Sequence, residues 1–186
     1  MKERKELDED ARWKYVELVD QALLDIEKIP VPVIAAINGQ ALGGGTELTL
    51  VCDIRLSIAD ADFGLTETGI GIILKSSIVR LLRDGHDGMN SLLIFTAAHF
   101  SAARMAEIRF LHQVVDDVAD LQEMALVLAQ QIAGNAPLAL RAAKTRWDAR
   151  LSRRIGRLLR KARSRIYRRM IVFLCIFMHL NEIYLL

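Results

Sequence analysis

The sequence predicts an α/β fold built on a parallel sheet. Two nearly continuous apolar runs, 31–37 and Ile54–Ala59, are typical of strands buried on both faces. A short helical pattern separates them, so they form a parallel βαβ unit whose loops gather beyond the carboxyl ends of the strands. With 186 residues, 52% hydrophobic and 26% charged, the chain can enclose one core of ordinary size.

The first predicted element is a helix between Asp8 and Ile29. Asp8 or Asp10 can cap its start, and Pro30 ends it. Apolar residues at helical spacing give it one buried face, which we expect to pack on the sheet: Val16, Val19, Leu23 and Ile26.

Three consecutive glycines, Gly43 to Gly45, follow the first strand. Bare backbone N–H groups at a helix start favour an anion or a developing oxyanion, and Glu47 lies in the first helical turn beside them. An ordinary tight turn is the alternative, since Asn38-Gly39 is itself a turn signal. Phosphate-binding loops are excluded, because neither Gly-Lys-Ser/Thr nor the G-x-G-x-x-G spacing is present.

The loop after the second strand, Ala61–Gly71, supplies another carboxylate, Glu67. Because loops that follow parallel strands meet at one edge, Glu47 and Glu67 can reach one cleft. Paired carboxylates divide acid and base duties when their surroundings separate their pKa values. The sequence therefore predicts addition of water across a polarised double bond.

Three further helices are predicted in the second half. Ser101 caps one that runs through Leu111, and Pro137 starts the last. Between them, a helix that ends near Gly134-Asn135 is marked by Leu121, Met124, Ala125, Leu128 and Ile132.

The segment from Ile29 to Ile73, IPVPVIAAINGQALGGGTELTLVCDIRLSIADADFGLTETGIGII, resembles the enoyl-CoA hydratase/isomerase (crotonase) superfamily. A weaker likeness continues to about Lys144. The resemblance implies a partial crotonase-like spiral of ββα units with a helical C-terminal segment. It divides the chain into a crotonase-like domain at 1–145, which lacks the first ββα units, and a basic amphipathic and apolar tail at 146–186.

The resemblance also implies an activity, the syn addition of water to a 2-enoyl-CoA thioester. Gly44 corresponds to the glycine whose N–H completes the thioester oxyanion hole, and Glu47 and Glu67 to the two glutamates that hold the attacking water. The presence of both favours the hydratase branch over the isomerase branch. No cofactor is implied, because coenzyme A is part of the acyl-CoA substrate, and the implied oligomer is the family's homotrimer. Implied substrate-binding residues are Ala41, Leu42, Gly43 and Gly71.

Three departures from the family pattern affect this expectation. The family's upstream Ala-Gly-Ala-Asp loop, which supplies the other oxyanion donor and part of the CoA site, would precede Met1. One such donor is worth about 2.7 to 4 kcal/mol, or roughly 10² to 10³ in rate, so we expect weak turnover from a truncated copy, and a degenerate copy with no turnover is the alternative. A bulkier segment, 74–79, replaces a glycine turn before Arg80, and the family's C-terminal helices, which cover the active site and build the trimer, are not recognisable after Lys144. Thr66 also replaces the usual proline before Glu67.

The C-terminal part of the chain is strongly basic. From Arg141 onward the chain has thirteen Lys and Arg residues and two acidic residues, which give this part a net charge of +11. Because the whole chain has a net charge of +2, residues 1–140 have a net charge of −9. The segment Arg150–Lys161 is predicted to form a basic amphipathic helix. Such a helix can bind nucleic acid, a membrane surface or an acidic partner, or it can dock on the body of the protein itself.

The competing function is that of a non-catalytic homologue that binds RNA or pairs with another subunit through residues 146–186. A tail without selected function also stays open. The apolar run 171–180 is too short to span a bilayer.

Other residue types predict no further chemistry. The four histidines have no paired spacing, so no metal site is expected. Cys52 and Cys175 form no disulfide framework, which indicates a reducing compartment. The charged start shows no secretory signal or mitochondrial presequence, so the expected location is the cytoplasm, or the mitochondrial matrix for a eukaryotic chain. Structural roles rather than catalysis are expected for Cys52, Asp53, Arg55, Met105 and Met124.

Overall fold

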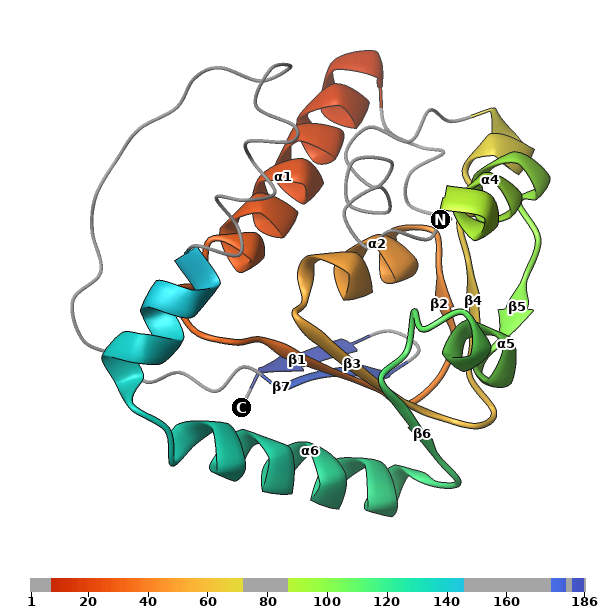
Figure 1. The fold of residues 1–186 in the computed structure, drawn as a ribbon. Coiled ribbons are helices and arrows are strands. Elements are labelled where there is room, and N and C mark those ends of the chain that lie inside the picture. Colours follow the sequence, from red (N-terminus) through yellow and green to blue (C-terminus); the bar gives the residue numbers. More distant parts are fainter. Residues whose placement is uncertain (1–7, 72–86, 146–174, 180–181, 186) are drawn as a thin grey trace.

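The computed structural model describes residues 8–71, 87–145, 175–179 and 182–185, which form two sheets and the helices around them (Figure 1). The five-stranded sheet has the order β6-β3-β1-β7-β8, and the three-stranded sheet the order β2-β4-β5. Neighbouring strands are parallel except in the pairs β7·β8 and β4·β5. The strands are β1 (Ile34–Ile37), β2 (Ala41–Leu42), β3 (Ile54–Ile58), β4 (Asp62–Gly64), β5 (Phe100–Ser101), β6 (Gln113–Val115), β7 (Cys175–His179) and β8 (Glu182–Leu185).

The predicted helices occur in the predicted order, and the helix at Asp87–Thr96 was not predicted. The Asp8 side chain caps α1 (Glu9–Glu27) by accepting the Ala11 N–H at 2.7 Å, and Asp117 caps α6 (Val118–Ala133) in the same way at the Asp120 N–H. A helix also covers residues 137–145, as Pro137 predicted. The remaining helices are α2 (Gly44–Val51), α4 (Asp87–Thr96), α5 (Ala102–Glu107) and the short 3-10 helix η2 (Thr68–Ile70).

The chain passes twice between the two sheets. Strand β1 is followed by β2 in the other sheet, then by α2, and β3 and β4 repeat the same passage. β1 and β3 pair in parallel with Ile34 opposite Ile54, and β2 and β4 pair in parallel with Leu42 opposite Gly64. The predicted parallel βαβ unit is therefore confirmed, and the second sheet is an addition that the sequence did not predict.

Both faces of the five-stranded sheet are covered, which explains the continuous apolar run in β1. Ile34 and Ala36 belong to the cluster that packs on α6, whereas Ala35 and Ile37 belong to the larger cluster beneath α1 and α2. Figure 1 shows α6 on one side of the sheet and α1 and α2 on the other. All four residues of β1 are buried, so neither face tolerates a polar side chain.

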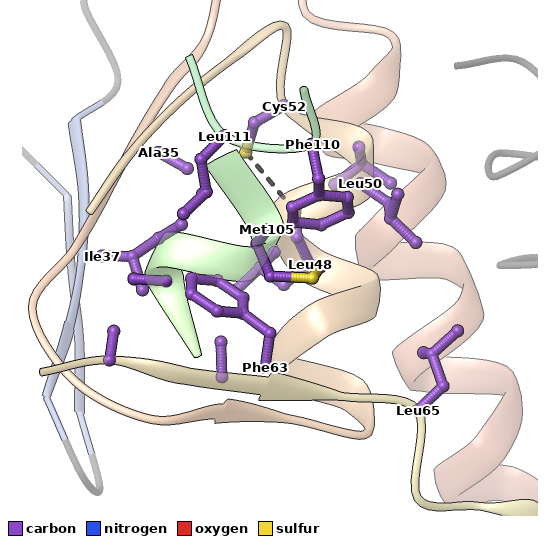
Figure 2. Close-up of a cluster of buried hydrophobic side chains, with 14 of the residues drawn as sticks. Ala35, Ile37, Leu48, Leu50, Cys52, Phe63, Leu65, Met105, Phe110 and Leu111 are labelled. Atoms are coloured by element: carbon purple, nitrogen blue, oxygen red, sulfur yellow. Dashed lines mark hydrogen bonds between the residues drawn. The ribbon is translucent and has the colours of Figure 1, made fainter. Parts of the chain in front are cut away.

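The larger cluster fills the space between α2, α5 and the small sheet (Figure 2). Phe63 and Phe110 are fully buried, with ring centroids 5.9 Å apart in an edge-to-face arrangement. Met105 is also fully buried, and the thiol of buried Cys52 lies 3.4 Å from the Leu48 carbonyl. The structural roles predicted for Cys52 and Met105 are confirmed, and Met124 packs on the second cluster.

Several predicted boundaries were wrong. The first strand begins at Ile34 rather than at residue 31, because Pro30 and Pro32 flank that start and cannot donate to a strand ladder. The helix capped by Ser101 ends at Glu107 instead of Leu111, because Arg109 adopts a left-handed conformation with φ of 62° and the chain turns away.

The tail departs further from expectation. Most of the expected helical C-terminal segment lies outside the described residues, and within the described part β7 and β8 are strands. β7 lies along the edge of β1, with Cys175 opposite Ile34, so backbone pairing favours an extended conformation there. The predicted helix at Arg150–Lys161 and the altered turn at 74–79 lie outside the described residues. Within the described ranges no helix has the length and apolarity that a membrane span requires.

Candidate active site

The candidate site is built around Gly43, at the turn between β2 and α2. Its φ of 55° and ψ of −120° suit glycine and disfavour residues with a side chain. Its N–H donates to the Gly64 carbonyl at 2.7 Å, which ties the turn to the end of β4. Its carbonyl accepts the Glu47 N–H at 3.0 Å, which closes the first turn of α2.

Gly44 is the first residue of α2 and is exposed. The first N–H groups of an α-helix have no partner within the helix, and they lie at its positive end. Among the described residues, no atom lies within 4 Å of the position that a Cβ on Gly44 would occupy. A carbonyl oxygen that gains negative charge can therefore approach this backbone closely.

Glu67 lies directly against Gly43. Its Oε1 atom is 2.8 Å from the position that a Cβ on Gly43 would occupy, and Thr66 Oγ1 is 3.4 Å from that position. Glu67 is half-buried, its Oε2 atom is buried, and it precedes η2. A side chain at residue 43 would displace this carboxylate.

Glu47 is half-buried in the first turn of α2, as predicted. Its amide is bonded to Gly43, and the Glu67 carboxylate packs on Gly43, so both glutamates border the same glycine. The segments that carry them follow the carboxyl ends of β2 and β4. The backbone segments that carry the two glutamates are thus brought together by the parallel pair β2·β4 of the small sheet, rather than by β1 and β3 as the sequence predicted.

The other predicted substrate-binding residues have different surroundings. Ala41 is fully buried in β2, Leu42 is half-buried, and Gly43 is buried beneath Glu67. Gly71 is exposed at the end of η2 with φ of 73°. Ala41 and Gly43 can therefore offer a substrate little besides backbone atoms.

Sequence reasoning missed two residues that shape the site. Gly64, at the end of β4, is buried, and a Cβ there would lie 2.7 Å from the Ala98 carbonyl oxygen. A glycine within a strand pattern is a signal of such close backbone approach. Thr46 is fully buried between β2 and β4, and its position in a helical pattern gave no sign of this.

A separate groove of about 370 Å³ lies at the opposite, amino ends of β1 and β3. Its lining includes the ion pair of Lys144 with Asp53. The Asp53 carboxylate also accepts the Val33 N–H at 2.7 Å. The structural role predicted for Asp53 is confirmed. The groove is lined by Pro32, Asp53, Ile54, Ile132, Leu140, Ala143 and Lys144. Within the described part of the chain, no group of three His, Cys, Asp or Glu residues could hold a metal ion.

Comparison with known proteins identifies the family. The enoyl-CoA hydratase/isomerase family model matches residues 1–172. The chain belongs to the enoyl-CoA hydratase/isomerase family. The Bacillus subtilis protein YngF, which carries the family's name, is 40% identical over 145 residues, covering 77% of this chain and 55% of the relative. The short-chain-enoyl-CoA hydratase of Clostridium acetobutylicum is 37% identical over 143 residues, covering 76% of this chain and 54% of the relative.

The fold is also that of this family. The solved structure of an enoyl-CoA hydratase from Bacillus anthracis superposes with a TM-score of 0.74 at 35% identity, covering 84% of this chain and 66% of that one. The predicted crotonase-like α/β class is therefore confirmed. This enoyl-CoA hydratase/isomerase chain spans about half the length of the curated relatives it matches.

Proposed function

We propose that the chain carries an enoyl-CoA hydratase site that adds water to the double bond of a 2-enoyl-CoA thioester. The observation that supports this most directly is the packing of Glu67 on Gly43, the glycine that directly precedes the helix bearing Glu47. Two carboxylates beside a helix N-terminus supply both the proton transfers and the anion stabilisation that hydration needs.

In the proposed reaction, the oxygen of a water molecule bonds to C3 of the thioester as the double bond between C2 and C3 opens, and a proton adds to C2. One glutamate accepts a proton from the attacking water, and the other donates the proton to C2. Negative charge that develops on the thioester oxygen is stabilised by the Gly44 N–H at the positive end of α2. Gly44 is suited to this because no side chain separates its backbone from the ligand.

Hydration of crotonyl-CoA tests the proposal, followed as loss of the conjugated enoyl-thioester absorbance. We expect Glu47→Gln and Glu67→Gln each to lower kcat by about 10² to 10⁴, because glutamine keeps the size but neither accepts nor donates the proton. Since the two groups act on one water, the double variant should lose little more than either single variant.

Glu123→Gln is the matched control, because Glu123 is an exposed carboxylate on α6, on the far side of the sheet. Turnover by the unmodified chain that neither site substitution lowers would refute the assignment of these glutamates. Movement of the double bond without addition of water would assign the chain to the isomerases of the family instead.

A further inference from the structure

We propose that Thr46 is a positioning residue that holds the two glutamate-bearing segments in fixed relation. This inference rests on the proposed hydratase function and adds a residue to it. Thr46 precedes Glu47 in α2, and its side chain reaches β4, which leads to Glu67 three residues after Gly64. One hydroxyl group therefore touches both halves of the candidate site.

Three backbone groups surround the Thr46 hydroxyl oxygen. It accepts the Gly64 N–H at 3.1 Å, and it lies within donor distance of two carbonyl oxygens, that of Gly64 at 3.0 Å and that of Ala41. The single hydroxyl proton can serve one of these carbonyls at a time. The side chain is fully buried, so no solvent competes for these contacts.

This contact adds to the hydrogen bond from the Gly43 N–H to the Gly64 carbonyl at 2.7 Å. The turn before α2 is thus joined to the end of β4 through both the N–H and the carbonyl of Gly64. Buried groups that lose a hydrogen-bond partner shift or open to recover one. Without the hydroxyl, the Gly43 bond and the short β2·β4 pairing remain to hold the two segments.

A small shift between the segments matters because Glu67 Oε1 already lies only 2.8 Å from the Cβ position of Gly43. Displacement of about 1 Å at a reacting group lowers rate by up to roughly 10². Because Thr46 is fully buried and does not reach a substrate itself, the effect falls on kcat more than on KM.

Thr46→Val, which matches threonine in shape and lacks the hydroxyl, tests the role against Thr46→Ser, which keeps it. Thr49→Val is the matched control, because Thr49 is equally buried on α2 and its hydroxyl donates within the helix, to the Thr46 carbonyl at 2.8 Å. We expect Thr46→Val to lower kcat on crotonyl-CoA about 10- to 100-fold with KM changed less than about threefold. Thr46→Ser should recover most of the rate, and Thr49→Val should retain it.

Amide hydrogen exchange at Gly64 measures the hydrogen bond between Gly64 and Thr46 and does not require catalytic activity. In Thr46→Val this N–H loses its acceptor and should exchange at least about tenfold faster, while Thr46→Ser and Thr49→Val stay near the unmodified rate. Unchanged exchange in Thr46→Val, or a kcat loss in Thr46→Ser as large as in Thr46→Val, would overturn the inference. If the chain shows this exchange pattern but no turnover, the proposed function is refuted, whereas the hydrogen-bonded connection made by Thr46 is supported.

Discussion

At the scale of single residues, Gly43 is the position that most strictly requires glycine. It combines a positive φ with a carboxylate packed on its α-carbon, so both backbone conformation and space exclude a side chain. Its neighbour Gly44 has open space around it and needs to be glycine only if a ligand approaches.

Gly43→Ala should therefore damage both stability and activity. The strained backbone conformation is expected to cost about 1 to 3 kcal/mol of unfolding free energy, and displacement of Glu67 should lower kcat by about 10². Thermal unfolding followed by circular dichroism and the crotonyl-CoA assay measure the two effects. Gly39→Ala is the control, since a Cβ there meets no atom of the described part of the chain within 4 Å. Equal losses in both variants would contradict this explanation.

Residue-scale prediction from sequence succeeded where the signal was local. The glycine triplet and the acidic residue after it indicate a helix start with Glu47 in its first turn, which the structure confirms. Thr46 could not be recognised, because its partners Ala41 and Gly64 belong to two strands too short to show a pattern. Thr66, which replaces a proline, lies at the site, with its hydroxyl 3.4 Å from the Cβ position of Gly43.

At the scale of elements, Arg55 joins β3 to α2 and to the segment before β6. The side chain is buried, and its guanidinium donates to the carbonyls of Phe110 at 2.7 Å, Cys52 at 3.0 Å and Thr49 at 3.3 Å. It also stacks 5.0 Å from the centroid of the Phe110 ring. The structural role predicted for Arg55 is confirmed.

Arg55→Leu should lower the unfolding free energy by about 2 to 4 kcal/mol, because it leaves these buried carbonyls without their charged donor. Arg55→Lys should recover only part of that loss, since one ammonium group cannot match the guanidinium fork. Urea unfolding measures both values. A lysine variant as stable as the unmodified chain would show that charge alone, rather than the fork, is what the site requires.

The prediction of helices and strands also succeeded where the sequence signal was local and failed where it was not. Helices α1 and α6 and strands β1 and β3 were found because their apolar periodicity is local and several residues long. Strands of two or three residues, such as β2, β4 and β5, contain too few positions to show alternation. β7 is a strand through its pairing with the edge of β1, a contact between residues about 140 positions apart that no local pattern reveals.

At the scale of the whole molecule, one central sheet carries a hydrophobic cluster on each face. Phe63 belongs to the cluster beneath α2, and Leu121 of α6 belongs to the cluster on the opposite face; both are fully buried. Because adjacent residues of β1 contribute to opposite clusters, loss of one face should destabilise the other.

Phe63→Ala and Leu121→Ala should therefore shift a single unfolding transition. We expect losses of about 3 to 5 kcal/mol for Phe63→Ala and about 2 to 5 kcal/mol for Leu121→Ala, from lost burial and the cavities left behind. Tryptophan fluorescence and far-ultraviolet circular dichroism should give coincident urea curves. Two separated transitions in either variant would show that the faces unfold independently.

The most direct test of the proposed hydration follows crotonyl-CoA in D₂O by proton NMR. The proposed site predicts 3-hydroxybutyryl-CoA with one deuterium at C2, formed by the unmodified chain at a rate that Glu47→Gln or Glu67→Gln lowers by about 10² or more. Absence of the hydrated product from the unmodified chain, or its formation at equal rates in all three proteins, would contradict the account of a two-glutamate hydratase site.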